Sequence, residues 1–188
     1  RQYEAGGLYR RFCESRRVDP KSVVDWRQIP ALPSDAFNAA LGTPGEHERS
    51  FVFRSSGTST GADARSKHAL TTLDTYKLAA LAHFESMVLP DAPGPLAVLI
   101  LGPTRETHPE SSLGCMFSWI AERWSDGTSL SAFDAEGKVD VAKAIEWVGA
   151  AASAAAPVLV LGVTSALTAV LDELRRSDAV MRLPADSR

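Results

Sequence analysis

The stretch Leu96-Ala-Val-Leu-Ile-Leu101 is the strongest structural signal in this sequence of 188 residues. All six side chains are apolar, whereas a strand with one face in water alternates between apolar and polar positions. Unbroken apolar runs of this length are typical of strands that helices cover on both faces, as in a parallel sheet. The stretch therefore predicts a buried strand of an α/β domain.

On both sides of this stretch, short apolar runs bounded by Gly, Pro or Ser predict further strands at 50–54, 130–133 and 158–161. Helical patterns occupy 72–88, 111–124, 139–155 and 165–175. Because strands and helices alternate, we expect a mostly parallel sheet flanked by helices. Ligands of such sheets bind beyond the carboxyl ends of the strands, so the loops after the strands are the places to look for chemistry.

The first fifty or so residues differ from this pattern. An amphipathic helix is predicted at 2–15, a proline-punctuated stretch covers 19–33, and a short helix is expected to begin at Ser34 or Asp35. We expect these residues to form a helical cap that packs on the sheet. The sequence then predicts one domain over 1–188, with the cap at 1–49 and the α/β core at 50–188.

Composition excludes several classes of protein. Hydrophobic residues make up 45% and charged residues 23% of the chain, and the net charge of -3 provides no basic field for nucleic acid. Cys13 and Cys115 lack the spacing of a disulfide framework or a zinc site, which predicts a cytoplasmic protein without a metal site in this chain. The apolar stretch 148–163 is shorter than the ~20 residues of a membrane span. The missing initiator Met and the abrupt end lead us to expect a piece of a longer protein.

The segment Ser55-Ser-Gly-Thr-Ser-Thr-Gly61 follows the first predicted strand and combines hydroxyl side chains with two glycines. Glycine lets a backbone approach a ligand closely, and the hydroxyl and amide groups are neutral donors for phosphate oxygens. Arg65 and Lys67 follow and could supply countercharge. The spacing excludes the GxxxxGK[ST] loop of P-loop nucleotidases. On composition alone, an ordinary flexible surface loop is an equally good interpretation.

This segment resembles the Thr/Ser-Ser-Gly-Thr-Thr-Gly phosphate loop of the adenylate-forming (ANL) superfamily, and more narrowly that of the acyl-protein synthetase (LuxE-like) branch. Two later elements of that branch are matched by Ser66-Lys67-His68 and by Leu101-Gly-Pro103 with Ser111-Ser-Leu-Gly-Cys-Met116. Ile29-Pro-Ala-Leu-Pro33, Phe37 and Gly162-Val-Thr164 extend the resemblance over 29–188. It departs from the family in having three residues, not two, between the glycines of the loop.

The resemblance implies part of an ANL-type N-terminal domain that uses ATP and Mg²⁺ to activate a carboxylic acid, expected to be a fatty acid, as an acyl-adenylate. It implies that Lys67 and His68 are catalytic, Lys67 as a mobile positive charge. The implied ATP phosphate-binding residues are Ser55, Ser56, Gly57, Thr58, Ser59, Thr60 and Gly61. The family's magnesium ligand, ribose-binding aspartate, mobile lysine and acyl-accepting cysteine would all lie beyond Arg188.

The long polar connection 102–112 follows the strand at Leu96–Leu101 and is the second expected site. The resemblance places the acyl pocket there and after the last strand, at His108, Ser111, Ser112, Met116, Gly162 and Thr164. Purely structural roles for these residues also remain open. Ser111 fits a helix N-cap, and His108 fits an ordinary surface histidine. His83 and the two cysteines are expected to be structural.

Three functions remain open at this point. The first is an acyl-protein synthetase type of ligase, whose partners would be a small-molecule carboxylic acid and an acyl carrier or another acyl-donating or accepting protein, with neither nucleic acid nor a membrane span. The second is an acyl- or aryl-CoA ligase resembling phenylacetate-CoA ligase, since the same half-reaction precedes either acceptor. The third is an inactive partial adenylation domain that acts as an interaction module.

Overall fold

The computed structural model describes residues 3–4, 7–33, 51–55, 66–91 and 94–188. The chain divides into two compact units, Arg1–Thr72 and Leu73–Arg188.

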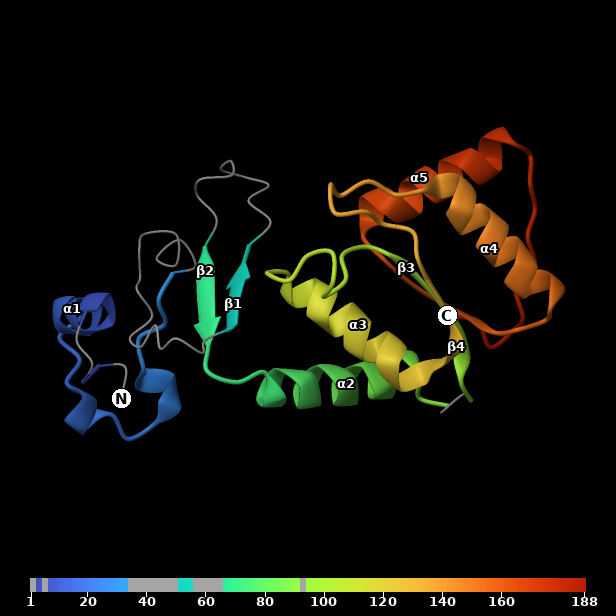
Figure 1. Ribbon diagram of the computed structural model, residues 1–188. Helices are drawn as coiled ribbons and strands as arrows, with labels where there is room; N and C mark the ends of the chain where they lie inside the picture. Colours follow the sequence, from blue (N-terminus) through green and yellow to red (C-terminus); the bar gives the residue numbers. More distant parts are fainter. Residues whose placement is uncertain (1–2, 5–6, 34–50, 56–65, 92–93) are drawn as a thin grey trace. The chain divides into compact units, whose positions relative to one another are not determined.

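The second unit is built on a parallel sheet of three strands in the order β4-β3-β5 (Figure 1). These strands are β3 (Leu96–Leu101), β4 (Ser125–Ser131) and β5 (Val158–Gly162). Ala97 of β3 pairs with Val158 of β5, and Leu99 of β3 pairs with Leu130 of β4. The predicted strands at 96–101 and 158–161 are therefore confirmed, and so is the α/β class.

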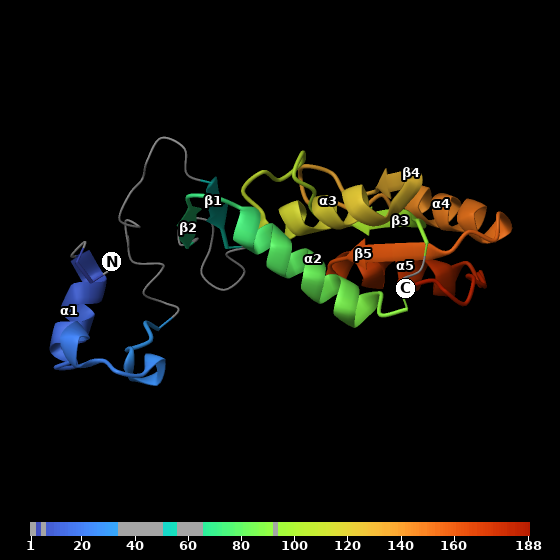
Figure 2. The same ribbon diagram turned by 90° about the horizontal axis from the view of Figure 1, so that it is seen from below.

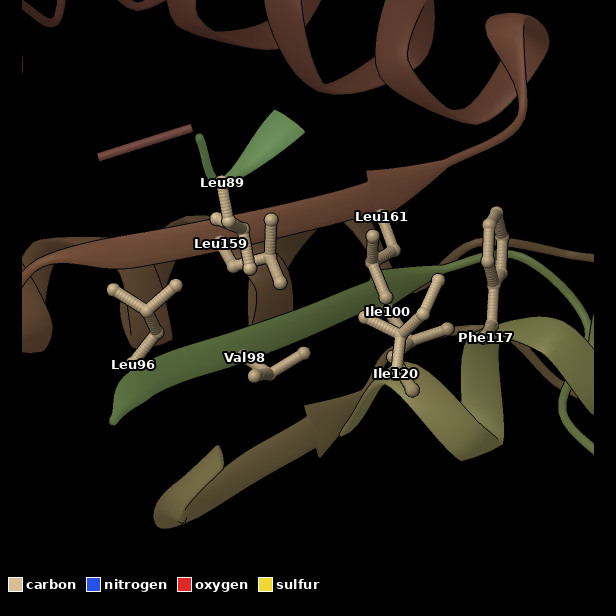
Figure 3. Packing of buried hydrophobic residues seen from close by; sticks show 8 residues of the cluster. All are labelled: Leu89, Leu96, Val98, Ile100, Phe117, Ile120, Leu159 and Leu161. Carbon is tan, nitrogen blue, oxygen red and sulfur yellow. The ribbon is translucent and has the colours of Figure 1, made fainter. Parts of the chain in front are cut away.

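Four helices flank this sheet in two pairs: α2 (Asp74–Val88), α3 (Ser112–Trp124), α4 (Val141–Ser153) and α5 (Thr164–Arg176). Val98 and Ile100 of β3 pack in one core cluster with Phe117 and Ile120 of α3 (Figure 3). Apolar residues of α2 pack against this cluster. Leu99 and Leu101 pack in a second cluster with residues of α4 and α5. Alternate side chains of β3 thus enter two different cores, which explains why the whole strand is apolar.

The placement of the helices follows from the order of the strands. The chain leaves the central β3 toward β4 through α3, and it returns past β3 to β5 through α4. Right-handed crossovers in opposite directions place their helices on opposite faces of the sheet. Figure 2 shows this unit from a second side. The loop after β3 leads to α3 on one face of the sheet, and the loop after β5 leads to α5, which packs with α4 in the core cluster of the other face.

The prediction for β4 was partly wrong. The apolar run at 130–133 predicted the strand, whereas β4 spans Ser125–Ser131 and most of its residues are exposed. β4 lies at the edge of the sheet, where exposed strand positions take polar side chains, so its first residues carry no apolar signal. Beyond the strand, Phe133 forms an isolated antiparallel bridge with Val139.

The first unit contains α1 (Gly7–Ser15), the short 3₁₀ helices η1 (Pro20–Ser22) and η2 (Trp26–Gln28), and two strands. The strands β1 (Phe51–Arg54) and β2 (Lys67–Leu70) pair antiparallel with Arg54 opposite Lys67. The strand predicted at 50–54 exists, but the expectation that it belongs to the parallel sheet was wrong. The backbone of β1 instead forms its strand pairing with β2, a strand that the sequence analysis did not predict. The helix predicted to begin at Ser34 or Asp35 lies outside the described residues.

Among the helices in the described parts of the chain, none combines the length and the apolar character that crossing a membrane requires.

Candidate functional site

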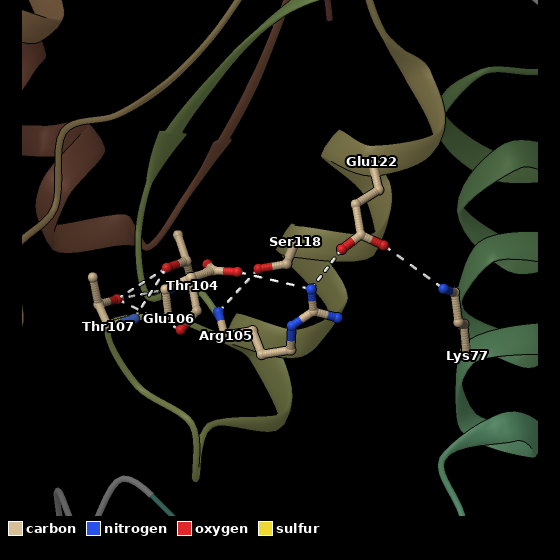
Figure 4. Close-up of polar contacts among 7 residues, drawn as sticks. All are labelled: Lys77, Thr104, Arg105, Glu106, Thr107, Ser118 and Glu122. Carbon is tan, nitrogen blue, oxygen red and sulfur yellow. Dashed lines mark hydrogen bonds and ion pairs between the residues drawn. The ribbon is translucent and has the colours of Figure 1, made fainter. Parts of the chain in front are cut away.

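The loop after β3 is fixed by hydrogen bonds at the carboxyl edge of the sheet (Figure 4). The backbone N–H of Thr104 donates to Oγ1 of Thr107 at 3.1 Å, and the N–H of His108 donates to the carbonyl oxygen of Thr104 at 2.9 Å. The N–H of Arg105 donates to Oγ of Ser118 on α3, also at 2.9 Å. Thr104 and Ser118 are both buried, so these bonds form away from bulk water. These hydrogen bonds therefore hold the loop in one conformation against α3.

Two glycines allow the loop to lie this close to α3. A Cβ atom on Gly114 would lie 2.8 Å from the carbonyl oxygen of Thr104, and one on Gly102 would lie 2.8 Å from Cε2 of Phe117. Any larger residue at Gly114 would have to push the loop away from the start of the helix. The sequence Gly-Pro after β3 and Ser-Ser-Leu-Gly at the helix start thus fits this close approach.

A charged network borders the same loop (Figure 4). Nη2 of Arg105 lies 2.7 Å from Oε1 of Glu122 on α3, and Nζ of Lys77 on α2 lies 3.7 Å from the other oxygen of Glu122. Arg105 also lies 3.8 Å from a carboxylate oxygen of Glu106. The Lys77 ammonium lies over the ring of Trp119, 5.6 Å from its centre. Both cations therefore have anionic neighbours at short range.

A cavity of about 500 Å³ opens beside this loop, between α3 and β4. Its volume is in the range of small-molecule sites. Hydroxyl side chains, two carboxylates and two apolar residues line it: Thr104, Thr107, Ser118, Ser129, Ser131, Glu106, Glu122, Ile100 and Ala121. The walls therefore combine hydrogen-bonding groups with patches of carbon.

The carboxyl of Glu106 is held in its ionised form. Hydrogen bonds from its own backbone N–H and from the Thr104 hydroxyl lower its pKa, and the Arg105 charge and the Ser118 hydroxyl act in the same direction. Partial burial opposes them without prevailing. Because an ordinary glutamate is already ionised at neutral pH, Glu106 presents a carboxylate to the cavity.

Ser111 and His108, two residues of the expected acyl pocket, have local partners in this loop. Oγ of Ser111 accepts a hydrogen bond of 3.0 Å from the N–H of Gly114, so the N-cap interpretation is confirmed. Nδ1 of His108 lies 2.9 Å from Oγ1 of Thr107, and its ring lies 5.9 Å from that of Phe133. His108 thus joins the loop after β3 to the segment after β4.

The other four expected pocket residues have different immediate neighbours. The carbonyl oxygen of Ser112 accepts a hydrogen bond of 3.0 Å from the hydroxyl of Tyr76, and Met116 packs against the core beneath α3. A Cβ on Gly162 would lie 2.9 Å from Cγ of Leu167, and Thr164 is exposed at the start of α5. None of the six lines the cavity described above. The acyl pocket stays a prediction.

The expected phosphate segment is described only at its edge. Residues 56–61 lie outside the described part of the chain, which includes Ser55. The N–H of Ser55 donates to the carbonyl oxygen of Ser66 at 3.0 Å, and the N–H of Ser66 donates to Oγ of Ser55 at 3.0 Å. These reciprocal bonds tie the ends of β1 and β2 together at the base of the segment.

The two expected catalytic residues lie on β2. Lys67 and His68 are both exposed, and Nε2 of His68 lies 3.3 Å from the hydroxyl oxygen of the buried Ser66. The Ser66-Lys67-His68 element is therefore part of the strand that closes the segment, with Ser66 anchored in the unit and the next two side chains near solvent.

The two cysteines are buried, and burial raises the pKa of the Cys115 thiol. A buried thiol of raised pKa is a poor nucleophile, in agreement with the expected structural role. His83 is exposed on α2. In the described residues, no three His, Cys, Asp or Glu side chains converge as metal ligands do.

Sequence reasoning missed the residues that build the cavity. Thr104, Glu106 and Thr107 fall inside the polar connection 102–112, but none was chosen as a site residue. Ser118 carried a usable signal, because a serine between Phe117 and Trp119 on the buried side of a helix needs a partner. Ser129 and Ser131 of the edge strand carried no comparable signal.

A scan against protein-family models, a search of curated proteins and a search of solved structures each returned no match.

Proposed function

We propose that this chain takes part in the ATP-dependent activation of a carboxylic acid as an acyl-adenylate, followed by transfer of the acyl group to a protein or carrier thiol. One observation carries the proposal. The hydroxyl- and glycine-rich segment that begins at Ser55 joins two strands whose ends are tied by the reciprocal Ser55–Ser66 hydrogen bonds. A segment with a fixed base can present its donors to phosphate oxygens at a smaller entropic cost than a free linker.

The reaction places defined demands on such a segment. A carboxylate oxygen attacks the α-phosphorus of ATP, and the bond from that phosphorus to the oxygen bridging to the β-phosphate breaks, so that pyrophosphate leaves. Two anions must approach one another, and the negative charge on pyrophosphate must be offset. Neutral donors in the loop suit the phosphate oxygens, and Lys67 beside it supplies a positive charge. Mg²⁺, when bound to ATP, would offset further charge.

The test is carboxylate-dependent exchange between ATP and pyrophosphate, measured on the full-length protein with fatty and aryl acids. Exchange with at least one acid is expected. Gly57→Val should abolish it, and Lys67→Ala should raise the KM for ATP more than that for the acid. Lys143→Ala, on the exposed surface of α4, is the matched control and should behave as the wild type.

Failure of exchange with every acid would overturn the proposal. Retained ATP binding without exchange would favour the interaction-module alternative. Where exchange is found, incubation with CoA or with a carrier protein identifies the acceptor by the thioester that forms.

A further inference from the structure

The cavity between α3 and β4 has a chemistry of its own, which the proposed function does not use. Its hydroxyl side chains come from three elements: the loop after β3 (Thr104, Thr107), α3 (Ser118) and β4 (Ser129, Ser131). Hydroxyls both donate and accept hydrogen bonds, and carboxylates accept them. A ligand that matches this lining carries several hydroxyl groups, which likewise both donate and accept hydrogen bonds.

The charges near the cavity balance. Lys77 and Arg105 carry positive charges, and Glu106 and Glu122 carry negative ones. Glu122 contacts both cations, and Arg105 also lies 3.8 Å from Glu106. No basic side chain lines the cavity itself, but each of its two carboxylates has the Arg105 guanidinium nearby, at 3.8 Å from Glu106 and 2.7 Å from Glu122. A neutral ligand is therefore favoured over an ammonium compound or a carboxylate.

The polar groups of the loop are held in place before any ligand arrives. The buried Ser118 hydroxyl accepts from the Arg105 N–H, and the hydroxyls of Thr104 and Thr107 lie 3.2 Å apart. The hydroxyls of Thr104 and Ser118 also lower the pKa of the Glu106 carboxyl, which borders the same loop. Holding donors and acceptors in position reduces the ordering cost of binding. Ile100 and Ala121 add carbon surface against which the C–H face of a ring can pack.

We propose that this cavity binds a neutral polyhydroxylated small molecule of the size of a sugar ring, with Glu106 as the principal acceptor of its hydroxyl groups. The volume of about 500 Å³ accommodates a single five- or six-membered ring with room for water. The hydroxyl groups of such a ring can bond to the hydroxyl and carboxylate groups of the lining, and its C–H faces can pack on the carbon surface of the lining.

The test is a titration of the ¹⁵N-labelled chain with D-ribose and with D-glucose, followed by NMR in the absence of ATP. Saturable shifts are expected at the amides of Thr104, Arg105 and Ser118. Glu106→Gln keeps the size of the side chain but removes its charge, and it should weaken binding roughly tenfold, as expected for a hydrogen bond to a charged acceptor. Glu146→Gln on α4, which belongs to the opposite face of the sheet, is the matched control and should leave the affinity unchanged.

A second variant addresses the opposite wall. Ser131→Leu places a bulky side chain in the cavity from β4, and it should abolish the shifts while the rest of the spectrum stays that of the folded chain. The proposal is overturned if neither sugar produces saturable shifts, if Glu106→Gln or Ser131→Leu binds as the wild type does, or if propylammonium or hexanoate binds the same residues more tightly than the sugars. Because ATP is absent, these outcomes are independent of the adenylation proposal.

Discussion

The hydroxyl oxygen of Ser118 accepts a hydrogen bond of 2.9 Å from the backbone N–H of Arg105. The bond joins the buried side of α3 to the loop after β3, and Ser118 is only 7% exposed. A helix and a loop that are adjacent in the chain are thus also joined through one side chain, at the wall of the cavity.

Ser118→Ala should lower the free energy of unfolding by about 1–3 kcal/mol, because the N–H of Arg105 loses its partner in a place with little access to water. Urea unfolding measures the loss. Ser86→Ala removes a hydroxyl from an exposed position of α2 and should change stability by less than about 0.5 kcal/mol. Equal effects at the two positions would contradict the structural role of Ser118.

Gly114→Ala and Gly149→Ala should have effects of opposite sign. At Gly114, the new methyl group would lie 2.8 Å from the carbonyl oxygen of Thr104, so we expect a loss of about 1–2 kcal/mol despite the better helix propensity of alanine. At Gly149 of α4, the nearest atom is Cε of Met181 at 3.7 Å, an ordinary contact. There alanine should stabilise the protein by up to about 1 kcal/mol. The midpoints of thermal unfolding of both variants provide the comparison, and a stabilised Gly114→Ala protein would refute it.

Alkaline pH should destabilise the second unit. Burial raises the pKa of the Cys115 thiol above its ordinary 9.0, and that of the Tyr76 phenol above 10.0. The unfolded chain therefore releases these protons at lower pH than the folded chain does. The resulting stabilisation is complete below about pH 9 and is lost as the pH rises through the higher pKa values of the folded state.

Urea midpoints between pH 7 and pH 10.5 measure this loss. Cys115→Ala should be less stable at neutral pH, because a buried side chain is shortened, yet its stability should fall less steeply with alkali. A slope identical to that of the wild type would show that Cys115 does not contribute.

Glu122→Gln should cost less than about 1 kcal/mol, although Glu122 contacts both Arg105 and Lys77. All three side chains are roughly half exposed, and ion pairs in contact with water contribute little. The difference from the wild type should shrink in 1 M NaCl, because salt screens such pairs. Glu173→Gln, which removes the i,i+3 pair with Arg176 on α5, is the control, and its effect should be smaller still. A large effect that persists in salt would mean that Glu122 acts through packing.

The elements that the sequence predicted well are those in which every residue carries the same signal. Both ends of β3 were predicted at the correct residue, because all six of its residues are buried and apolar, so that the apolar run begins and ends with the strand. The helix predicted at 111–124 was observed at Ser112–Trp124, with Ser111 as the expected cap. In both cases, a local pattern is sufficient to define the element.

The elements that were missed depend on neighbours distant in the chain. β2 has the sequence Lys-His-Ala-Leu, which has no strand pattern of its own, and it forms a strand because it pairs with β1. The polar first residues of β4 form a strand because they pair with β3. The cavity has the same origin, since Glu106, Ser118 and Ser131 meet only when a loop, a helix and an edge strand are brought together. Glu106 and Ser131 are unremarkable within their own segments, and only Ser118 carries a local signal, as a buried serine between Phe117 and Trp119.

The central position of β3 has a consequence for the order in which this sheet assembles during synthesis. β3 pairs on one side with β4, which follows it after a single helix, and on the other with β5, which emerges from the ribosome only after α4. Its second edge, with Leu99 and Leu101 on the face toward α4 and α5, must wait for the later part of the chain. Nascent chains that stop before Val158 should therefore expose one of the most apolar strands of the sequence, and a chaperone that recognises extended apolar segments would find its substrate there.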